Sequence, residues 1–435
     1  MASGTKTILV GGGIGGLTAA IALHRAGADV TVYEQAPELA EIGAGINVQA
    51  VAIGVLHDLG LDEKMFLSND LGNGIETSFI EYYTVDGVKI AFEPVGRRLG
   101  SQFPQLSMHR AWFHSALVAK VKELGIKFHL DHAFVSMDRH ADDSVTVHFE
   151  KTSARGQKQP SATCDFLIGA DGLKSPVRAA LVGADVMPRY TGKVIYRGLT
   201  KLPALISDGT TVGLAGNEHF NFIAYPVSDS MRQKGETYCN WGFVIERPHP
   251  GENAEDWRKT VTLDAIREDL RKLEGMDYGG FSPLQIAERT DKIIEWALFD
   301  RDPIESWDFG SATLLGDAAH PLLPYGSQGA SQAIMDAEAL GVCYSRAMAE
   351  GQDVKAAVKM YSDFRAGPAG RVVIANRTMG STAVLRVADA ACKGMTREEK
   401  EQWAQANGQK MFDEVITEYR QSMPKSVRMA PVSKP

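Results

Sequence analysis

A glycine-rich loop near the start of the chain has the spacing needed to bind a pyrophosphate. Gly11, Gly13 and Gly16 follow residues 6–10, which predict a short buried strand, and precede a stretch that predicts a helix to about Arg25. Glycines at these positions permit a tight turn and let backbone amides approach phosphate, while the helix N-terminus supplies positive potential. Glu34 stands 18 residues beyond Gly16, at the end of a second predicted strand, where it would accept hydrogen bonds from a ribose. This βαβ context predicts dinucleotide binding without separating NAD from FAD.

Two later segments repeat the order of strand, turn and helix. Residues 166–168 predict a buried strand, residues 169–172 a turn, and Ser175-Pro176 the start of a helix, with proline in its favoured early position. Residues 312–315 predict a third strand, Gly316-Asp317 a turn, and a helix follows from about Ala330. These segments have the pattern of a nucleotide-binding α/β domain.

Other parts of the chain have a different character. Residues 190–245 are rich in aromatic and β-branched residues, which predicts antiparallel sheet, and residues 75–95 carry a smaller β pattern with an Asp86-Gly87 hairpin turn. Thr396 and Glu399 form a capping box that predicts a polar helix over 396–420. A β-rich domain therefore interrupts the nucleotide-binding domain.

The segment from Gly316 onward resembles a known family, and this resemblance indicates FAD rather than NAD. Residues 316–321, together with the loop 324–330, resemble the flavin-binding segment of the single-component, group A flavoprotein aromatic monooxygenases. The resemblance implies that Asp317 binds the FAD ribityl chain and that the loop lies beside the flavin ring. The next helix would direct its N-terminus at the flavin N1/C2=O edge, where it favours an anionic reduced flavin. Residues 168–178, including Asp171, resemble the family's internal Asp-Gly motif, and Arg110 matches an arginine that contacts FAD.

The likeness extends from about residue 5 to 378 and is greatest in one branch. Residues 43–49, 103–107, 299–303 and 329–334 resemble the 5-methylphenazine-1-carboxylate 1-monooxygenase branch, with salicylate-hydroxylase-type enzymes more distant. The implied fold is α/β, of the glutathione-reductase (GR2), p-hydroxybenzoate-hydroxylase type. Its expected parts are a Rossmann-like FAD-binding domain (1–75, 100–185 and 295–378), a β-rich substrate domain (76–99 and 186–294) and a C-terminal helical tail (379–435). The implied FAD-binding residues are Gly11, Gly13, Ile14, Gly15, Gly16, Glu34, Arg110, Asp171, Asp317, Gly329 and Ala330.

The resemblance also implies the chemistry, which belongs to the cofactor. NADH or NADPH would reduce the flavin, O2 would add at C4a to give a hydroperoxide, and an electron-rich aromatic or heteroaromatic ring, phenolic or carboxylated, would be hydroxylated. Oxidative decarboxylation and Baeyer–Villiger oxidation are alternatives on the same scaffold. We expect no catalytic side chain and no metal. His320 and His109 are better explained as residues that orient their loops than as bases.

The substrate pocket is expected between the β-rich domain and the flavin. Its candidate residues are Tyr196, Arg197, Tyr225, Trp241, Pro324 and Tyr325. Arg197 could clamp a substrate carboxylate or form a structural ion pair. Cys239, Trp241 and Phe243 alternate onto one strand face, which could line the pocket, although core packing is the commoner role of such a face.

Two other function classes fit less well. A flavin halogenase would carry a Trp-x-Trp-x-Ile-Pro segment, which is absent, and an ene-reductase-type saturase is no better supported. A non-enzymatic carrier of this architecture has no use for the Gly316-Asp317 turn. The net charge of −8 argues against nucleic-acid binding. Four cysteines without CxxC spacing argue against zinc or disulfides, and no apolar run approaches the length of a membrane span. We therefore expect a cytoplasmic protein. It is expected to be a monomer or a homodimer.

Overall fold

The computed structural model describes residues 4–39, 44–67, 73–183, 187–249, 251, 259–378 and 381–422. A five-stranded parallel sheet forms its first half, in the order β19-β12-β1-β2-β8. Its strands are β1 (Lys6–Val10), β2 (Asp29–Tyr33), β8 (Lys127–His129), β12 (Phe166–Gly169) and β19 (Ala312–Leu314). Successive residues of β1, β12 and β19 are buried because both faces of these strands are covered. The three predicted strand-turn-helix segments therefore meet in one sheet.

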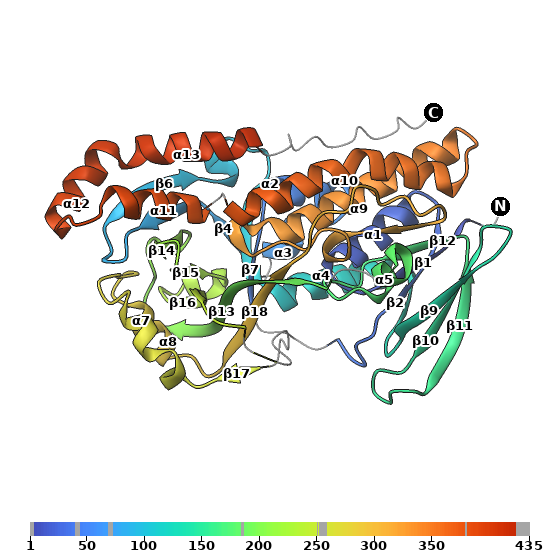
Figure 1. The fold of residues 1–435 in the computed structure, drawn as a ribbon, viewed down its shortest axis with the longest axis horizontal. Coiled ribbons are helices and arrows are strands. Elements are labelled where there is room, and N and C mark those ends of the chain that lie inside the picture. The colour runs from blue at the N-terminus through green and yellow to red at the C-terminus, as the bar shows by residue number, and fades with distance from the viewer. Residues whose placement is uncertain are drawn as a thin grey trace.

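Helices cover this sheet on both faces (Figure 1). α1 (Ile14–Arg25) packs closely against α9 (Gln328–Ala349), and a Cβ built on Gly15 would lie 2.9 Å from Ala333 Cβ. The other helices of this half are α2 (Ala50–Asp58), α3 (Lys64–Leu67), α4 (Arg110–Glu123), α5 (Pro176–Val182) and α10 (Val354–Thr378). The glycine loop thus brings the first and third predicted segments into direct contact.

An eight-stranded mixed sheet forms the second half, in the order β17-β18-β13-β16-β15-β14-β5-β6. Its strands are β5 (Phe79–Tyr83), β6 (Lys89–Pro94), β13 (Arg189–Leu202), β14 (Val212–Gly216), β15 (Phe220–Pro226), β16 (Thr237–Glu246), β17 (Thr260–Val261) and β18 (Ile293–Asp300). The two β-rich segments predicted from the sequence are joined here by the parallel pair β5–β14. Short helices α6 (Asp229–Arg232), α7 (Arg267–Arg271) and α8 (Pro283–Glu288) lie at its margins.

Two three-stranded sheets complete the strands. β3 (Gly45–Val48), β7 (Gln105–His109) and β4 (Ile75–Thr77) form one, between the two halves of the molecule. β9 (Ala133–Arg139), β10 (Val145–Glu150) and β11 (Lys158–Cys164) form the other, which the sequence analysis did not predict. Figure 1 shows this second sheet projecting beside β2 and β12.

The C-terminal segment lies on the eight-stranded sheet (Figure 1). It consists of α11 (Ser381–Ala391), α12 (Arg397–Trp403), a π-helical turn η5 (Ala404–Gly408) and α13 (Gln409–Ser422). The predicted capping box of Thr396 and Glu399 is confirmed at the start of α12. Phe412 packs against Tyr82, with ring centroids 5.2 Å apart, so the tail shares an apolar core with the sheet. No helix within the described ranges is long and apolar enough to cross a membrane.

Candidate active site

The glycine loop between β1 and α1 has the backbone form expected of a phosphate-binding turn. Gly11 has a φ of 109°, and a Cβ there would lie 2.3 Å from the carbonyl oxygen of Ala170. A Cβ on Gly16 would lie 2.1 Å from the Gly11 carbonyl oxygen. A Cβ on Gly13, in contrast, would meet nothing within 4 Å. Gly11 and Gly16 are therefore needed for the turn itself, whereas Gly13 borders open space.

Glu34 lies where the sequence predicted, beside this loop. Its Oε2 accepts a hydrogen bond from the Gly12 amide at 2.6 Å, and its Oε1 accepts one from the Ala36 amide at 2.8 Å. His114 of α4, which the sequence analysis did not single out, contacts the Gly12 carbonyl through Nε2 at 2.7 Å. Glu34, His114 and Gly13 line a cavity of about 490 Å³ with Arg110 at its edge. The cavity has the donors and acceptors that an adenosine diphosphate group requires.

Asp171 is engaged mainly with its own helix. Its Oδ1 accepts a hydrogen bond from the Ser175 hydroxyl at 2.5 Å, and its Oδ2 accepts one from the Val177 amide at 3.1 Å. Burial raises the pKa of this carboxyl to about 6. Arg178, one turn into α5, donates to the carbonyl oxygens of Ala318 and Ala319 at 3.2 and 2.9 Å. The Asp-Gly motif thus supports the Gly316-Asp317 turn through Arg178.

Asp317 and Arg110 lie close enough for the charge of each to affect the pKa of the other. Asp317 lies in a 3-10 turn, η3 (Gly316–Ala318), and its side chain is accessible to solvent. The surrounding protein raises the pKa of Asp317, while the charges of His320 and Arg110 oppose that rise. Burial lowers the pKa of Arg110, and the charge of Asp317 opposes that change. Asp317 and Arg110 therefore stay candidates for contact with a ribityl-pyrophosphate chain.

His320 is committed to a buried network. Its Nε2 lies 2.5 Å from Asp336 Oδ2, and Trp307 stacks on its ring with centroids 5.3 Å apart. The ring is only 2% exposed, and its contacts with Asp336 and Trp307 hold the turn in place. His109 similarly caps α4, since its Nδ1 accepts from the Ala111 amide. Both observations agree with the loop-orienting roles expected from the sequence.

The loop before α9 is open where a flavin ring would lie. Ser327 precedes the helix with a φ of 57°, and no side-chain cap satisfies the first amides of α9. A Cβ on Gly329 would meet nothing within 4 Å, so the first helical turn borders empty space together with Ala330. Gln49 donates from Nε2 to the Gly326 carbonyl at 3.1 Å and ties this loop to β3. The helix N-terminus is thus available to a negatively charged group.

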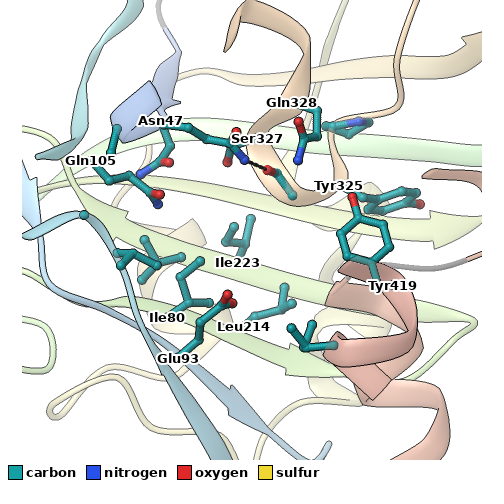
Figure 2. A pocket seen from close by; sticks show the side chains of 18 of the residues that line it. Asn47, Ile80, Glu93, Gln105, Leu214, Ile223, Tyr325, Ser327, Gln328 and Tyr419 are labelled. Atoms are coloured by element: carbon teal, nitrogen blue, oxygen red, sulfur yellow. Dashed lines mark hydrogen bonds between the residues drawn. The ribbon is translucent and has the colours of Figure 1, made fainter. Parts of the chain in front are cut away.

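A second cavity of about 520 Å³ lies between this loop and the eight-stranded sheet. Figure 2 shows Tyr325, Ser327 and Gln328 on one side of it and Ile80, Leu214 and Ile223 on the side of the sheet. The volume falls within the usual range for small-molecule sites, roughly 300–1,000 Å³, and apolar side chains dominate the lining. An aromatic ring fits such a surface.

Three of the predicted pocket residues line this cavity, namely Tyr225, Pro324 and Tyr325. Trp241 does not, because it is fully buried on the opposite face of β16, where it stacks on Phe222 and donates to Thr290 Oγ1. Tyr196 packs in the same core. The face of β16 that was considered as a pocket wall is therefore a packing face, and Val244 of the other face lines the cavity.

Arg197 lies next to the cavity without lining it. Its Nη2 donates to the Gly45 carbonyl at 3.3 Å, and its Nε is buried without a partner among the described residues. Burial lowers its pKa, and the nearby charges of Tyr225 and Arg110 act in opposite directions on it. No structural ion pair is formed with a described carboxylate, so a donor remains for a ligand.

Several polar groups of the cavity were missed by the sequence analysis. Asn47 donates from Nδ2 to Ser107 Oγ at 2.8 Å, which leaves its buried Oδ1 without a partner in the described structure. Asn221 Nδ2 is also buried and unpaired there, and so is the hydroxyl of Tyr325, which the sequence did predict for the pocket. Buried polar atoms normally have partners, so these three are candidates for ligand contacts. Nothing local in the sequence marks Asn47 or Asn221, because their roles depend on the cavity.

These residues fit FAD. The open surfaces at Gly13 and Gly329 lie at the starts of α1 and α9, helices that pack against one another, and Arg110 lines the same cavity as Gly13. Both helix starts lack a side-chain cap, so their amides are available to anionic groups. The wider cavity then adjoins the flavin end of this site. Residue 43, at the start of one resemblance segment, lies outside the described residues.

Comparison with known proteins gives the family. A sequence model of the FAD binding domain matches residues 4–376. The phenazine 1,6-dicarboxylic acid hydroxylase PhzS of Lysobacter antibioticus is 33% identical over 86% of this chain and 90% of its own length. The 3-hydroxybenzoate 6-hydroxylase of Polaromonas naphthalenivorans is 32% identical over 86% of both chains.

Solved structures share the fold along almost the whole chain. Klebsiella pneumoniae HpxO, complexed with FAD and uric acid, superimposes with a TM-score of 0.72 at 24% identity and covers 97% of both chains. A salicylate hydroxylase substrate complex gives 0.69 at 22% identity and covers 99% of this chain and 100% of that one. The glycine loop, the Gly316-Asp317 turn and the adjoining apolar cavity therefore belong to a flavoprotein, and the chain is a member of the FAD-dependent aromatic-ring monooxygenase family.

Proposed function

We propose that this enzyme hydroxylates a phenolic or carboxylated aromatic or heteroaromatic small molecule, with consumption of NADH or NADPH and O2. The observation that carries the proposal is the apolar cavity of about 520 Å³ beside the loop 324–330. Relatives named for phenazine 1,6-dicarboxylic acid, 3-hydroxybenzoate and 6-hydroxynicotinate support an aromatic substrate with an acidic group.

The cofactor roles follow from the contacts described above. Backbone amides of Gly13, Ile14 and Gly15 would face the pyrophosphate, Glu34 the adenosine ribose, and Arg110 and Asp317 the chain between them. The first turn of α9, with Gly329 and Ala330, would face the flavin ring. Asp171 would act through the turn that it supports. FAD, when bound, supplies the oxygen-activating chemistry.

The chain's own residues would bind the ring, orient it and exclude water. The side chains of Ile223 and Leu214 form an apolar floor that disfavours water, and Tyr225 and Tyr325 would fix the ring against it. Arg197, which has a buried donor without a described partner, is proposed to hold a substrate carboxylate or phenolate near Tyr225. No side-chain nucleophile is needed for this chemistry.

A compound panel tests the proposal. NADH and NADPH oxidation would be followed with phenols, aromatic acids, and phenazine-like and quinoline-like heteroaromatics, and each product would be weighed by mass spectrometry. Stimulated oxidation with a mass gain of one oxygen supports hydroxylation. Loss of a carboxyl group with gain of a hydroxyl identifies oxidative decarboxylation, and insertion of oxygen next to a ketone identifies a Baeyer–Villiger reaction. Absence of stimulation by every class would reject an aromatic substrate.

We also propose a cytoplasmic location and a monomeric or homodimeric state. The four cysteines are all buried and free, which is typical of proteins from a reducing compartment. Cell fractionation and light scattering of the purified protein test the two statements separately.

A further inference from the structure

The cavity contains a carboxylate on the side opposite the loop 324–330, which is called the flavin loop below. Glu93 of β6 lines the cavity, and Figure 2 shows it across from Ser327 and Gln328. Its side chain is 17% exposed, and burial raises its pKa. A carboxylate is costly to bury without partners, so its position against an otherwise apolar wall needs an explanation.

Two side chains hold this carboxylate in place. The Tyr82 hydroxyl donates to Glu93 Oε2 at 3.3 Å, and Arg420 Nη2 donates to Glu93 Oε1 at 3.0 Å. An ionised carboxylate has about four acceptor positions, and these bonds occupy two of them. Each oxygen can therefore accept one further hydrogen bond from a group inside the cavity.

The partner Arg420 comes from the C-terminal helix α13, beyond the residues that the family model matches. α13 also supplies Ile416 and Tyr419 to the cavity lining, and Tyr419 forms a hydrogen bond with Gln328 at the start of α9. Gln409, at the other end of α13, exchanges two hydrogen bonds of 3.2 Å with the backbone of Phe92. The tail is thus fixed to β6 and forms part of the cavity wall.

Among the described residues, the cationic side chains that line the cavity are Arg365 and Arg420, and both are paired with carboxylates, Arg365 with Asp336 and Arg420 with Glu93. The end of the cavity near Glu93 therefore offers an acceptor rather than a free cation. A ligand carboxylate at this end would meet Glu93 at an energetic cost, whereas an O–H or N–H group would complete its hydrogen bonds.

We propose that Glu93, held by Tyr82 and by Arg420 of α13, is a specificity-determining residue that accepts a hydrogen bond from an O–H or N–H group at the end of the substrate remote from the flavin loop. The proposal rests on the proposed function and narrows its substrate class to aromatic compounds with a donor at that end. Substrates with an acidic group would place it at the other end, near Arg197.

Two naphthols that differ only at the remote end test this. The probes are 2,6-dihydroxynaphthalene and 6-methoxy-2-naphthol, and their dissociation constants are measured from the change in flavin absorbance of the FAD-loaded enzyme. A hydrogen bond to a charged acceptor predicts that the diol binds about tenfold more tightly or better. In Glu93→Gln this ratio should fall to nearly one, and in Glu93→Asp it should fall less, because the charge is kept but withdrawn by one methylene.

A neighbouring cluster offers a matched control. Glu81 of β5 accepts a hydrogen bond from Tyr83 at 2.5 Å and pairs with Lys89, so it has the same kinds of partner, but it does not line the cavity. Glu81→Gln should leave the ratio at its wild-type value. FAD content and the melting temperature show whether each variant is folded, and Glu93→Asp carries the test if Glu93→Gln loses FAD.

Three results would overturn the proposal: equal binding of the two naphthols by the wild type, an unchanged ratio in folded Glu93 variants, or no spectral change with either naphthol. The proposed function is judged separately, by aromatic-stimulated NADH or NADPH oxidation across the wider panel. Stimulation by compounds without a remote donor would leave the proposed function intact while contradicting the role of Glu93.

Discussion

Asp336 of α9 and Arg365 of α10 form a buried ion pair directly behind the Gly316-Asp317 turn, with 2.7 Å between Arg365 Nε and Asp336 Oδ1. The other oxygen of Asp336 contacts His320 and accepts a hydrogen bond from the Gly316 amide at 3.1 Å. Complete burial raises the pKa of Asp336, but the contacts with His320 and Arg365 outweigh this effect and hold the pKa at about 2. One carboxylate therefore fixes two helices to the turn that carries Asp317.

Asp336→Asn should destabilise the protein by roughly 3–5 kcal/mol, because removing one partner leaves buried charge on Arg365 unpaired. Urea denaturation measures this free energy. Asp363→Asn is the control, since Asp363 pairs with Lys359 on the exposed face of α10 and should change stability by less than about 0.5 kcal/mol. Similar effects of both substitutions would contradict the structural role of Asp336.

We expect the ionisation of Asp171 to lower the free energy of unfolding of the apoprotein as the pH rises. Its folded-state pKa is about 6, above the value near 3.9 expected for an unfolded chain, so the folded state binds more protons in this interval. The contribution of Asp171 is therefore fully present below about pH 4 and is lost between about pH 4 and 6. Urea midpoints over this range measure the fall, which Asp171→Asn should reduce. A variant with an unaltered pH profile would show that Asp171 is not the titrating group.

Gly13→Ala and Gly16→Ala should separate FAD binding from folding. At Gly13 the added methyl meets no protein atom within 4 Å and projects into the predicted pyrophosphate site. We expect unchanged apoprotein stability but FAD affinity lowered roughly tenfold, as for overpacking of about 1–3 kcal/mol. At Gly16 the methyl would lie 2.1 Å from the Gly11 carbonyl oxygen, so stability and FAD content should both fall. Reconstitution titrations give the FAD affinity, and melting curves give the stability. Wild-type FAD affinity in Gly13→Ala would show that the pyrophosphate does not bind beside Gly13.

Residues whose roles are local could be predicted from the sequence. Gly11 needs a positive φ, and Glu34 follows its strand at a fixed spacing, so the amino-acid pattern alone identifies both. Trp241 shows the limit: residues on both faces of β16 are buried, and only the structure shows that the Trp241 face packs in the core against Phe222 while Val244 of the other face lines the cavity. The pairing of Glu93 with Arg420 joins residues 327 positions apart, so no local pattern could reveal it.

Ile223→Trp should block the substrate cavity without affecting the cofactor. Ile223 lies on the sheet side of the cavity, where a larger side chain would occupy the space proposed for the ring. We expect aromatic-stimulated NAD(P)H oxidation to fall at least about tenfold, with FAD content preserved. Val135→Trp, on the exposed face of β9, is the control. Wild-type stimulation in Ile223→Trp would place the substrate outside this cavity.

The origin of the inserted oxygen tests the central claim most directly. The enzyme with bound FAD would turn over the best aromatic compound of the panel, with NADH or NADPH, under ¹⁸O2 in ordinary water. The account predicts that the ring of the product gains one oxygen atom that carries the ¹⁸O label, with consumption of one nicotinamide cofactor per product. Unlabelled oxygen in the product, or NAD(P)H oxidation that yields only hydrogen peroxide with every aromatic compound, would contradict it.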